Sequence, residues 1–287
     1  MPTRIQRLVF VAALVLGTAL MPGPAPAQSS GAAAKPWTPP RHADGQPDIQ
    51  GLWQTLGGGL TVSLQQGSVD LLDSDRIGFL DALRGLSKPI PIGLVDPADG
   101  KIPLQPWAEA RRKEIAANYR DPKGNLAYMD PSARCLGAGV PRINYVTPYN
   151  GYSFLQIPGY VVLYAEWNHE VRIIPLDGRP HVGGSLRLWM GDSRGRWEGH
   201  TLVVDVTNFN GHAWFDWLTF HSEALRVTER FTLLDADTIA YEATIDDPKV
   251  FTKPWKIALG FRRADSNYRL FEYACHEGNR YLESAMK

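Results

Sequence analysis

The feature that most constrains the fold is a series of short apolar–polar alternations that fills the C-terminal half of the chain. Between Tyr160 and Ile174, apolar residues occupy every second position, as in a strand with one buried face. Similar runs follow, joined by short turns rather than by long helices. Strands connected in this way are antiparallel neighbours, so the sequence predicts a mainly β fold, an antiparallel meander curled into a barrel or half-barrel. The later strands are expected at 201–209, 225–234, 238–246, 255–261 and 268–275.

The alternation also predicts which ionisable side chains face the interior. Glu229 shares its face with Leu225, Val227, Phe231 and Leu233. An unpaired buried carboxylate costs several kcal/mol. Glu229 is therefore expected either as a catalytic base with a raised pKa or in a structural ion pair with an arginine such as Arg172 or Arg179. His169, Glu272 and His276 are also expected to face inward. If His169 is a core histidine, it would bond a backbone carbonyl.

The N-terminal residues have the pattern of a secretory signal. A basic start at Arg4 and Arg7, an apolar run over Leu8–Leu20 and a small-residue cleavage site at Ala25–Ala27 predict a signal peptide at 1–27. The apolar run is too short to span a bilayer. We expect the processed protein in the periplasm or secreted, with no membrane association after cleavage.

Composition changes again before the strands begin. Residues 28–43 are proline-rich and predict an arm, and residues 44–132 predict an irregular and helical region that packs on a barrel domain at 133–287. The best helix pattern is Gln105–Tyr119, with a shorter one near Asp75–Leu86.

Charge and cysteine content narrow the classes further. The 30 basic and 30 acidic residues balance, and no basic stripe indicates a nucleic-acid partner. An exported chain with two cysteines, Cys135 and Cys275, predicts one disulfide. The oligomeric state is left open by the sequence.

The turn after the first long strand concentrates reactive side chains. Asp177-Gly178 is a tight-turn signal, which places Asp177, Arg179 and His181 at one mouth of the barrel, where we expect them to converge with Arg172 and His221. Arg179 is suited to a carboxylate or phosphate, and His181 to proton exchange. The alternative is an Asp–Arg pair that pins the loop.

Other catalytic signatures are weak. The histidines, with Glu229, could ligate zinc or copper, but none stands at a diagnostic spacing. Gly191-Asp192-Ser193-Arg194-Gly195 is not a nucleophile elbow, and no nucleotide-binding loop is present. We therefore expect no cofactor, with a metal as the open alternative.

Aromatic side chains crowd one segment. The loop Gly211–His221 is apolar enough to form a lid or pocket wall, with ordinary core packing as the alternative. If it lines a pocket, the ligand is apolar or aromatic. The residues involved are Trp189, Trp197, Trp214, Phe215, Trp217 and Phe220.

Several motifs occur together in one order: DGQPDIQGLW, RIIPLDGRPH, MGDSRGRWEGHTLVVD, ERF, DDPKVFTKPW and FEYACHEGN. In this the chain resembles a large, mostly unannotated family of exported bacterial proteins over most of its processed length. The resemblance implies a lipocalin-like barrel but no activity. Members of that family usually have Asp where this chain has His200, and often have Asp where it has Glu170. The position of His169 also varies among them. The matching residues that form the candidate site are Arg172, Asp177, Arg179, His181, Asp205, His221, Glu229 and Arg230.

Three functions follow as hypotheses. The first is an exported enzyme, a hydrolase, lyase or isomerase, doing cofactor-independent acid/base chemistry on a small apolar or aromatic molecule. The second is a lipocalin-like binding protein, and the third is a His-ligated metalloenzyme. The expected catalytic residues are His181, Glu229, Asp177, His221 and Asp205. The expected substrate-binding residues are Arg172, Arg179, Arg230, His169, Trp214, Trp217 and His276.

Overall fold

The computed structural model describes residues 37–56, 64, 90–145 and 151–285, which belong to one compact unit, Trp37–Lys287. The predicted signal peptide, most of the predicted arm and the predicted helix near Asp75–Leu86 lie outside the described residues.

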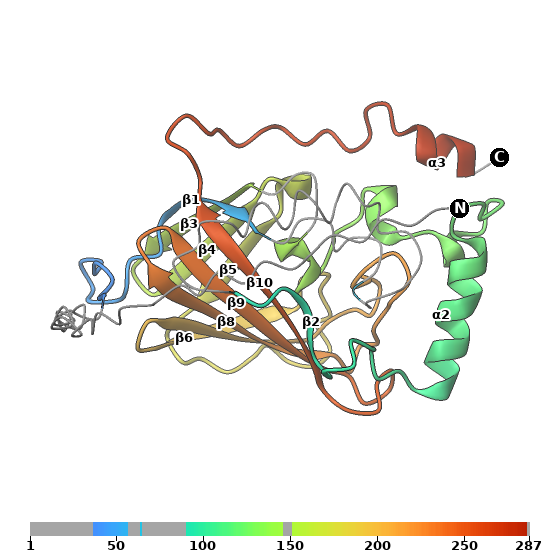
Figure 1. Ribbon diagram of the computed structural model, residues 1–287, viewed down its shortest axis with the longest axis horizontal. Coiled ribbons are helices and arrows are strands. Elements are labelled where there is room, and N and C mark those ends of the chain that lie inside the picture. The colour runs from blue at the N-terminus through green and yellow to red at the C-terminus, as the bar shows by residue number, and fades with distance from the viewer. Residues whose placement is uncertain (1–36, 57–63, 65–89, 146–150, 286–287) are drawn as a thin grey trace, which may run out of the picture. The chain divides into compact units, whose positions relative to one another are not determined.

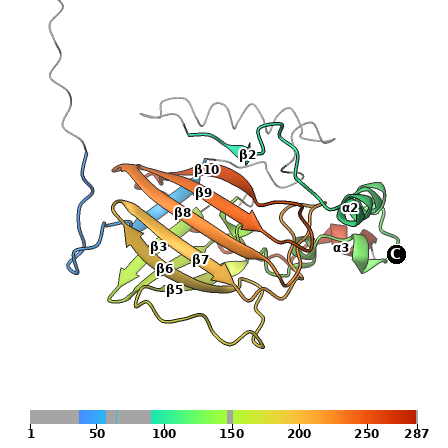
Figure 2. The same ribbon diagram turned by 90° about the horizontal axis from the view of Figure 1, so that it is seen from below.

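One antiparallel sheet of ten strands dominates this unit. Its order is β5-β4-β3-β1-β10-β9-β8-β7-β6, with β2 pairing β10 beside this path. Figures 1 and 2 show the strands curving round a common interior. The strands are β1 (Gly51–Thr55), β2 (Gly93–Asp96), β3 (Gly151–Ile157), β4 (Tyr160–Ala165), β5 (Val171–Pro175), β6 (Asp192–Glu198), β7 (Thr201–Thr207), β8 (Arg226–Asp235), β9 (Thr238–Asp246) and β10 (Trp255–Arg263).

The two outer strands of the path, β5 and β6, approach each other and nearly close the barrel. A side chain at Gly195 would lie 2.7 Å from the side chains of Ile174 and Leu176, so only glycine permits this approach. Arg172 of β5 donates from Nε to the Ser193 hydroxyl of β6 at 2.9 Å. The predicted antiparallel barrel is confirmed.

The first predicted strand, between Tyr160 and Ile174, is two separate strands in the structure, β4 and β5. The chain turns through the 3-10 segment η4 (Trp167–His169), where Asn168 and His169 have positive φ values of 55° and 52°. The turn changes which alternate residues face inward. Val171 and Ile173, predicted inside, are 54% and 59% exposed, whereas Arg172 is 3% exposed.

The last predicted strand, 268–275, is wrong, because this segment carries no strand assignment. Both β1 and β2 pair with the edge of β10 to which a strand at 268–275 would have paired. The barrel therefore takes a strand, β1, from the region before residue 133. Cys275 instead joins Cys135 in the predicted disulfide.

The helices lie beyond the strands. α2 (Pro106–Asn118) confirms the predicted helix, and both views place it past one end of the barrel. The amide of Gln105 donates to the carbonyl of Val250, in the β9–β10 connection, at 2.8 Å. No helix in the described ranges is long and apolar enough to cross a membrane. The remaining helical segments are η1 (Leu126–Tyr128), η2 (Pro131–Arg134), η3 (Arg142–Asn144) and α3 (Arg280–Ala285).

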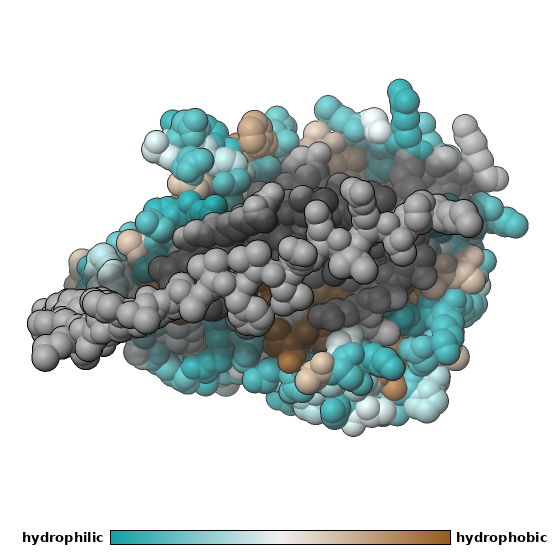
Figure 3. Space-filling view, viewed as in Figure 1, coloured by the Kyte–Doolittle hydropathy of each residue, from teal (hydrophilic) through white to brown (hydrophobic). Residues whose placement is uncertain are grey.

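Aromatic rings fill much of the interior. Phe231 lies 4.8 Å from Tyr241, 5.7 Å from Phe154 and 6.1 Å from Phe261, measured between ring centroids. Hydrophilic side chains predominate among the described residues on the face drawn in Figure 3. Packed rings therefore occupy the interior between these strands.

Candidate functional site

A buried polar group, here called the barrel cluster, surrounds Glu229, which is 0% exposed. Arg172 binds both of its carboxylate oxygens, with 3.0 Å from Nη1 to Oε1. Asn144 and Tyr241 donate to Oε1 at 3.0 and 2.8 Å. Burial and the charge of Glu229 raise the pKa of the Tyr241 hydroxyl, which keeps its proton for this bond. The predicted inward carboxylate paired with an arginine is confirmed, and its contacts are those of a structural pair.

Two candidate site residues lie on the outer surface instead. Asp205 of β7 accepts from Arg196 at 2.6 Å and from the Thr228 hydroxyl at 3.1 Å. Arg230 of β8 donates to Glu198 at 3.0 Å. Alternate residues of β7 and β8 point inward, so both side chains face away from the interior.

The Asp177–Arg179 pair pins its own loop. Arg179 donates from Nε to Asp177 Oδ1 at 2.9 Å and from Nη2 to the Tyr160 hydroxyl, at the start of β4, at 3.1 Å. Hydrogen bonds from Arg179 lower the pKa of Asp177. Both side chains are exposed, and neither lines the two pockets described below.

The predicted inward positions of three further residues are wrong. His169 is exposed on the η4 turn, and its Nε2 accepts from the Tyr273 amide at 3.2 Å. His276 and Glu272 are exposed because their segment is not a strand.

Trp217, predicted as a pocket wall, packs edge-on against Tyr119 at 5.9 Å between ring centroids.

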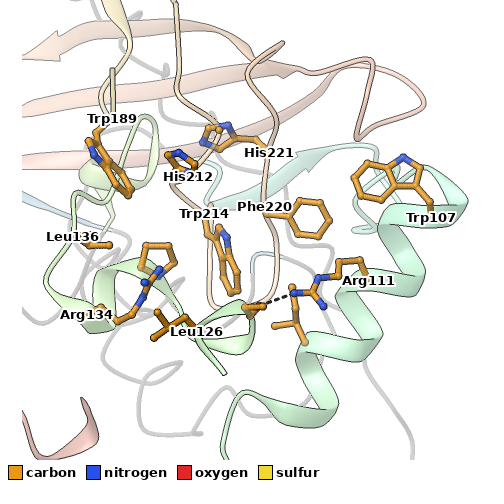
Figure 4. A pocket seen from close by; sticks show the side chains of 14 residues that line it. Trp107, Arg111, Leu126, Arg134, Leu136, Trp189, His212, Trp214, Phe220 and His221 are labelled. Atoms are coloured by element: carbon orange, nitrogen blue, oxygen red, sulfur yellow. Dashed lines mark hydrogen bonds between the residues drawn. The ribbon is translucent and has the colours of Figure 1, made fainter. Parts of the chain in front are cut away.

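A pocket of about 570 Å³, here called the aromatic pocket, lies at the end of the barrel near α2 (Figure 4). It is bounded by α2, by the segment from η1 through η2, by the loop before β6 and by the loop Gly211–His221. This volume is in the range of small-molecule sites. Its lining residues are Trp107, Arg111, Ile115, Leu126, Ala127, Pro131, Arg134, Leu136, Trp189, Gly211, His212, Trp214, Phe220 and His221.

The loop Gly211–His221 is a small hairpin that presents rings to this pocket. Trp214 and Phe220 are bridge partners, and directly opposite residues project to the same side. Asp216 fixes the turn, since its Oδ1 accepts from the amides of Leu218 at 2.8 Å and Thr219 at 2.6 Å. The prediction that this loop walls a pocket is confirmed for Trp214 and Phe220.

His221 closes this hairpin and is 4% exposed. Its Nδ1 lies 2.9 Å from the carbonyl of Ser222, which accepts only if Nδ1 carries the proton, so Nε2 is a bare acceptor. Burial lowers the pKa of His221, because the charged imidazolium is poorly solvated between Phe209 and Phe215. His221 is therefore neutral at neutral pH.

Two polar atoms of this lining are buried without a hydrogen-bond partner in the described part of the chain: Nε2 of His221 and Nε of Arg134. One is an acceptor and the other is a donor. Buried polar atoms in native proteins are nearly always paired, and unpaired ones at a pocket indicate a place for ligand or solvent. The aromatic pocket therefore combines an apolar wall with two complementary unpaired groups.

A second cavity, here called the polar pocket, also measures about 570 Å³. Nδ1 of His181 lies 2.8 Å from Oδ2 of Asp192, which also accepts from the Val182 amide at 3.1 Å. Arg194 donates to Oδ1 of Asp192 at 2.7 Å. A carboxylate held in this way orients a histidine for proton transfer. The other residues lining the pocket are Gly184, Arg187, Thr207, Asn208, Glu223, Ala224, Leu225, Arg226, Asp246 and Pro248.

The two pockets share a wall. Leu188 and Phe209 form a parallel bridge, with 2.8 Å from the Leu188 amide to the Asn208 carbonyl. Arg187 lines the polar pocket and Trp189 lines the aromatic pocket. The predicted convergence of five residues at one mouth is thus wrong. His181 and His221 lie near the start of β8 but in different pockets, and Arg172, Asp177 and Arg179 line neither.

Sequence reasoning missed Arg134, Trp107 and Asp192. Arg134 follows no periodic pattern, because it ends the short segment η2. Trp107 stood in the predicted helix and was not singled out, and Asp192 was considered only within the rejected elbow motif. The signal available for Asp192 was its place at the start of a strand that follows a histidine-bearing loop.

Among the described residues, no group of three or more His, Cys, Asp and Glu side chains is placed to hold a metal ion. Searches against protein-family models, curated proteins and solved structures give no match to this chain.

Proposed function

We propose that this protein is an exported enzyme that performs cofactor-independent acid/base chemistry on a small apolar or aromatic molecule in the aromatic pocket. The observation that carries the proposal is a pocket walled by Trp107, Trp189, Trp214 and Phe220 and lined by His221, whose buried Nε2 has no hydrogen-bond partner in the described part of the chain. Indole and phenyl rings hold a flat apolar substrate by stacking. Hydrolysis, elimination or isomerisation each require a proton acceptor at this position.

His221 is suited to the role of general base. Its lowered pKa leaves Nε2 unprotonated, and the bond from Nδ1 to Ser222 keeps the ring in the tautomer that accepts there. A substrate hydroxyl, an acidic C–H or a bound water would supply the proton. A positioned base of this kind contributes about 10²–10⁴-fold to a rate.

The polar pocket supports a second candidate site for the same class of chemistry. There Asp192 orients His181, and Nδ1 of that histidine is occupied by the carboxylate. Its lining carries charged side chains from Arg187, Glu223 and Arg226, so its substrate would be polar rather than aromatic.

One experiment separates the two sites. We would screen aromatic and apolar esters, lactones, alcohols and ketones by NMR with the native protein, His221→Gln and His181→Ala. Turnover should fall about 10²–10⁴-fold in His221→Gln, with the melting temperature retained, and persist in His181→Ala. Loss in His181→Ala alone would move the activity to the polar pocket. Saturable binding of aromatic compounds without conversion of any would favour the lipocalin-like binding protein.

We further propose that the protein acts in the periplasm or outside the cell. The Cys135–Cys275 disulfide supports this, because such bonds persist in oxidising compartments. N-terminal sequencing of protein recovered from an expressing cell should begin at Gln28, and an intact Met1 would contradict export through cleavage at this site.

A further inference from the structure

We infer that the ligand of the aromatic pocket is an aromatic carboxylate, whose anionic group is bound by Arg134. This inference rests on the proposed function of the pocket and names the class of its substrate. It starts from the charges that the pocket presents.

The lining is cationic. Its charged side chains are Arg111 and Arg134, since His221 is neutral at neutral pH, and no Asp or Glu is among the described residues that line it. A pocket with walls of low polarity and charge of one sign favours a ligand of the opposite charge. A neutral aromatic ligand would leave this charge uncompensated.

The two arginines differ in what they already bind. Arg111 donates to Glu114 at 2.6 Å and to the Ala127 carbonyl at 2.7 Å, so its charge is compensated within the protein (Figure 4). Arg134 makes no hydrogen bond or ion pair in the part of the chain that the structure describes, and its Nε is buried. Burying an arginine donor without a partner is unfavourable, which points to Arg134 as the group that a ligand completes.

The nearest acidic side chain along the chain is unavailable to Arg134. Asp130 caps η2 by accepting from the Ser132 amide at 2.9 Å. Both of its oxygens also accept from Arg142, at 2.8 and 2.5 Å. The fold therefore satisfies Asp130 with a different arginine, and among the described residues Arg134 has no acidic partner.

The geometry selects a carboxylate on an aromatic frame. A guanidinium presents parallel N–H groups that match the two oxygens of a carboxylate. Arg134 and Arg111 lie on either side of Trp214 in Figure 4, so a ring against this indole places a ring-attached carboxylate within the pocket's cationic region. The unpaired acceptor of His221 then remains for a donor elsewhere on the ligand.

The test compares two ligands of the same shape, 2-naphthoate and the neutral 2-naphthamide, by calorimetry and by quenching of tryptophan fluorescence. The native protein should bind 2-naphthoate about tenfold or more tightly than 2-naphthamide, because a hydrogen bond between charged groups is stronger than its neutral counterpart. Arg134→Gln should lose this preference and bind 2-naphthamide as before. Arg269→Gln, which removes an exposed cation that lines neither pocket, is the matched control and should keep the preference.

The comparison within the native protein does not depend on how Arg134→Gln folds. Equal binding of the two ligands would overturn the carboxylate inference and leave the proposed function standing. A preference that survives in well-folded Arg134→Gln would overturn the assignment to Arg134. Binding of neither ligand would overturn the inference and, with it, the aromatic pocket as the site of the proposed function.

Discussion

The barrel cluster and the aromatic pocket both bury ionisable side chains, but they treat the hydrogen bonds of those side chains in opposite ways. Glu229 has its oxygens bound by Arg172, Asn144 and Tyr241. His221 and Arg134, by contrast, each keep a buried nitrogen without a partner in the described part of the chain. The charge of Glu229 is satisfied within the barrel, whereas His221 and Arg134 line a pocket in which a ligand could satisfy them.

The largest effect is expected in the barrel cluster. Glu229→Leu leaves Arg172 buried without its counter-ion and should lower the free energy of unfolding by about 3–5 kcal/mol. The double variant Arg172→Met/Glu229→Leu removes both charges and should recover most of this loss. Urea unfolding measures both. A loss below about 1 kcal/mol in the single variant would contradict the account of the cluster as a desolvated, structural pair.

Removing the disulfide should perturb the aromatic pocket more than the barrel cluster. Cys135 directly follows Arg134, and its bond to Cys275 closes a loop with a sequence separation of 140 residues. Cys135→Ala/Cys275→Ala should lower the free energy of unfolding by about 2–4 kcal/mol. It should also weaken 2-naphthamide binding, since the wall beside Arg134 loses its tie to the C-terminal segment. Unchanged binding would show that the pocket wall is held by other contacts.

A smaller effect is expected in how the free energy of unfolding depends on pH, which distinguishes the aromatic pocket from the barrel cluster. Burial lowers the pKa of His221, so below about pH 6.5, the usual histidine value, the unfolded chain takes up a proton that the folded protein resists. The native protein should lose stability as pH falls from 7 towards 5. His221→Gln should show a shallower loss, measured as the free energy of unfolding against pH. His276→Gln, at an exposed position, controls for removing a histidine.

The smallest effect is expected at Arg179, outside both regions. Its pair with Asp177 is exposed to solvent and screened by it, so Arg179→Ala should leave the free energy of unfolding nearly unchanged. Catalysis and naphthamide binding should be unaffected. A loss of binding would show that this loop reaches the aromatic pocket in solution.

Much of the barrel could be predicted from the sequence, because period-two alternation and short turns are local signals. The runs that become β7 to β10 and the helix α2 were recovered in this way. Glu229 was correctly placed inside, since its own strand is continuous. The interior position of Arg172 was not predicted, because alternation was extended through a turn at Asn168 and His169.

The pocket was only partly predictable, for a physical reason. Its aromatic wall at Trp214 and Phe220 showed in the composition of one loop. Arg134 and Trp107 reach the pocket from segments brought together by tertiary packing, and no local pattern records such contacts. His181 and His221 were predicted at one site. The wall that separates them contains the bridge between Leu188 and Phe209, which forms only when the chain folds.

The turn at η4 has a consequence for how this chain can change length. Asn168 and His169, both with positive φ, reverse the chain so that Arg172 faces the barrel and Ile173 faces outward. Deleting or inserting a single residue between Ala165 and Val171 would exchange these faces, burying Ile173 and expelling the partner of Glu229. Descendants of this chain should therefore keep the η4 turn at constant length.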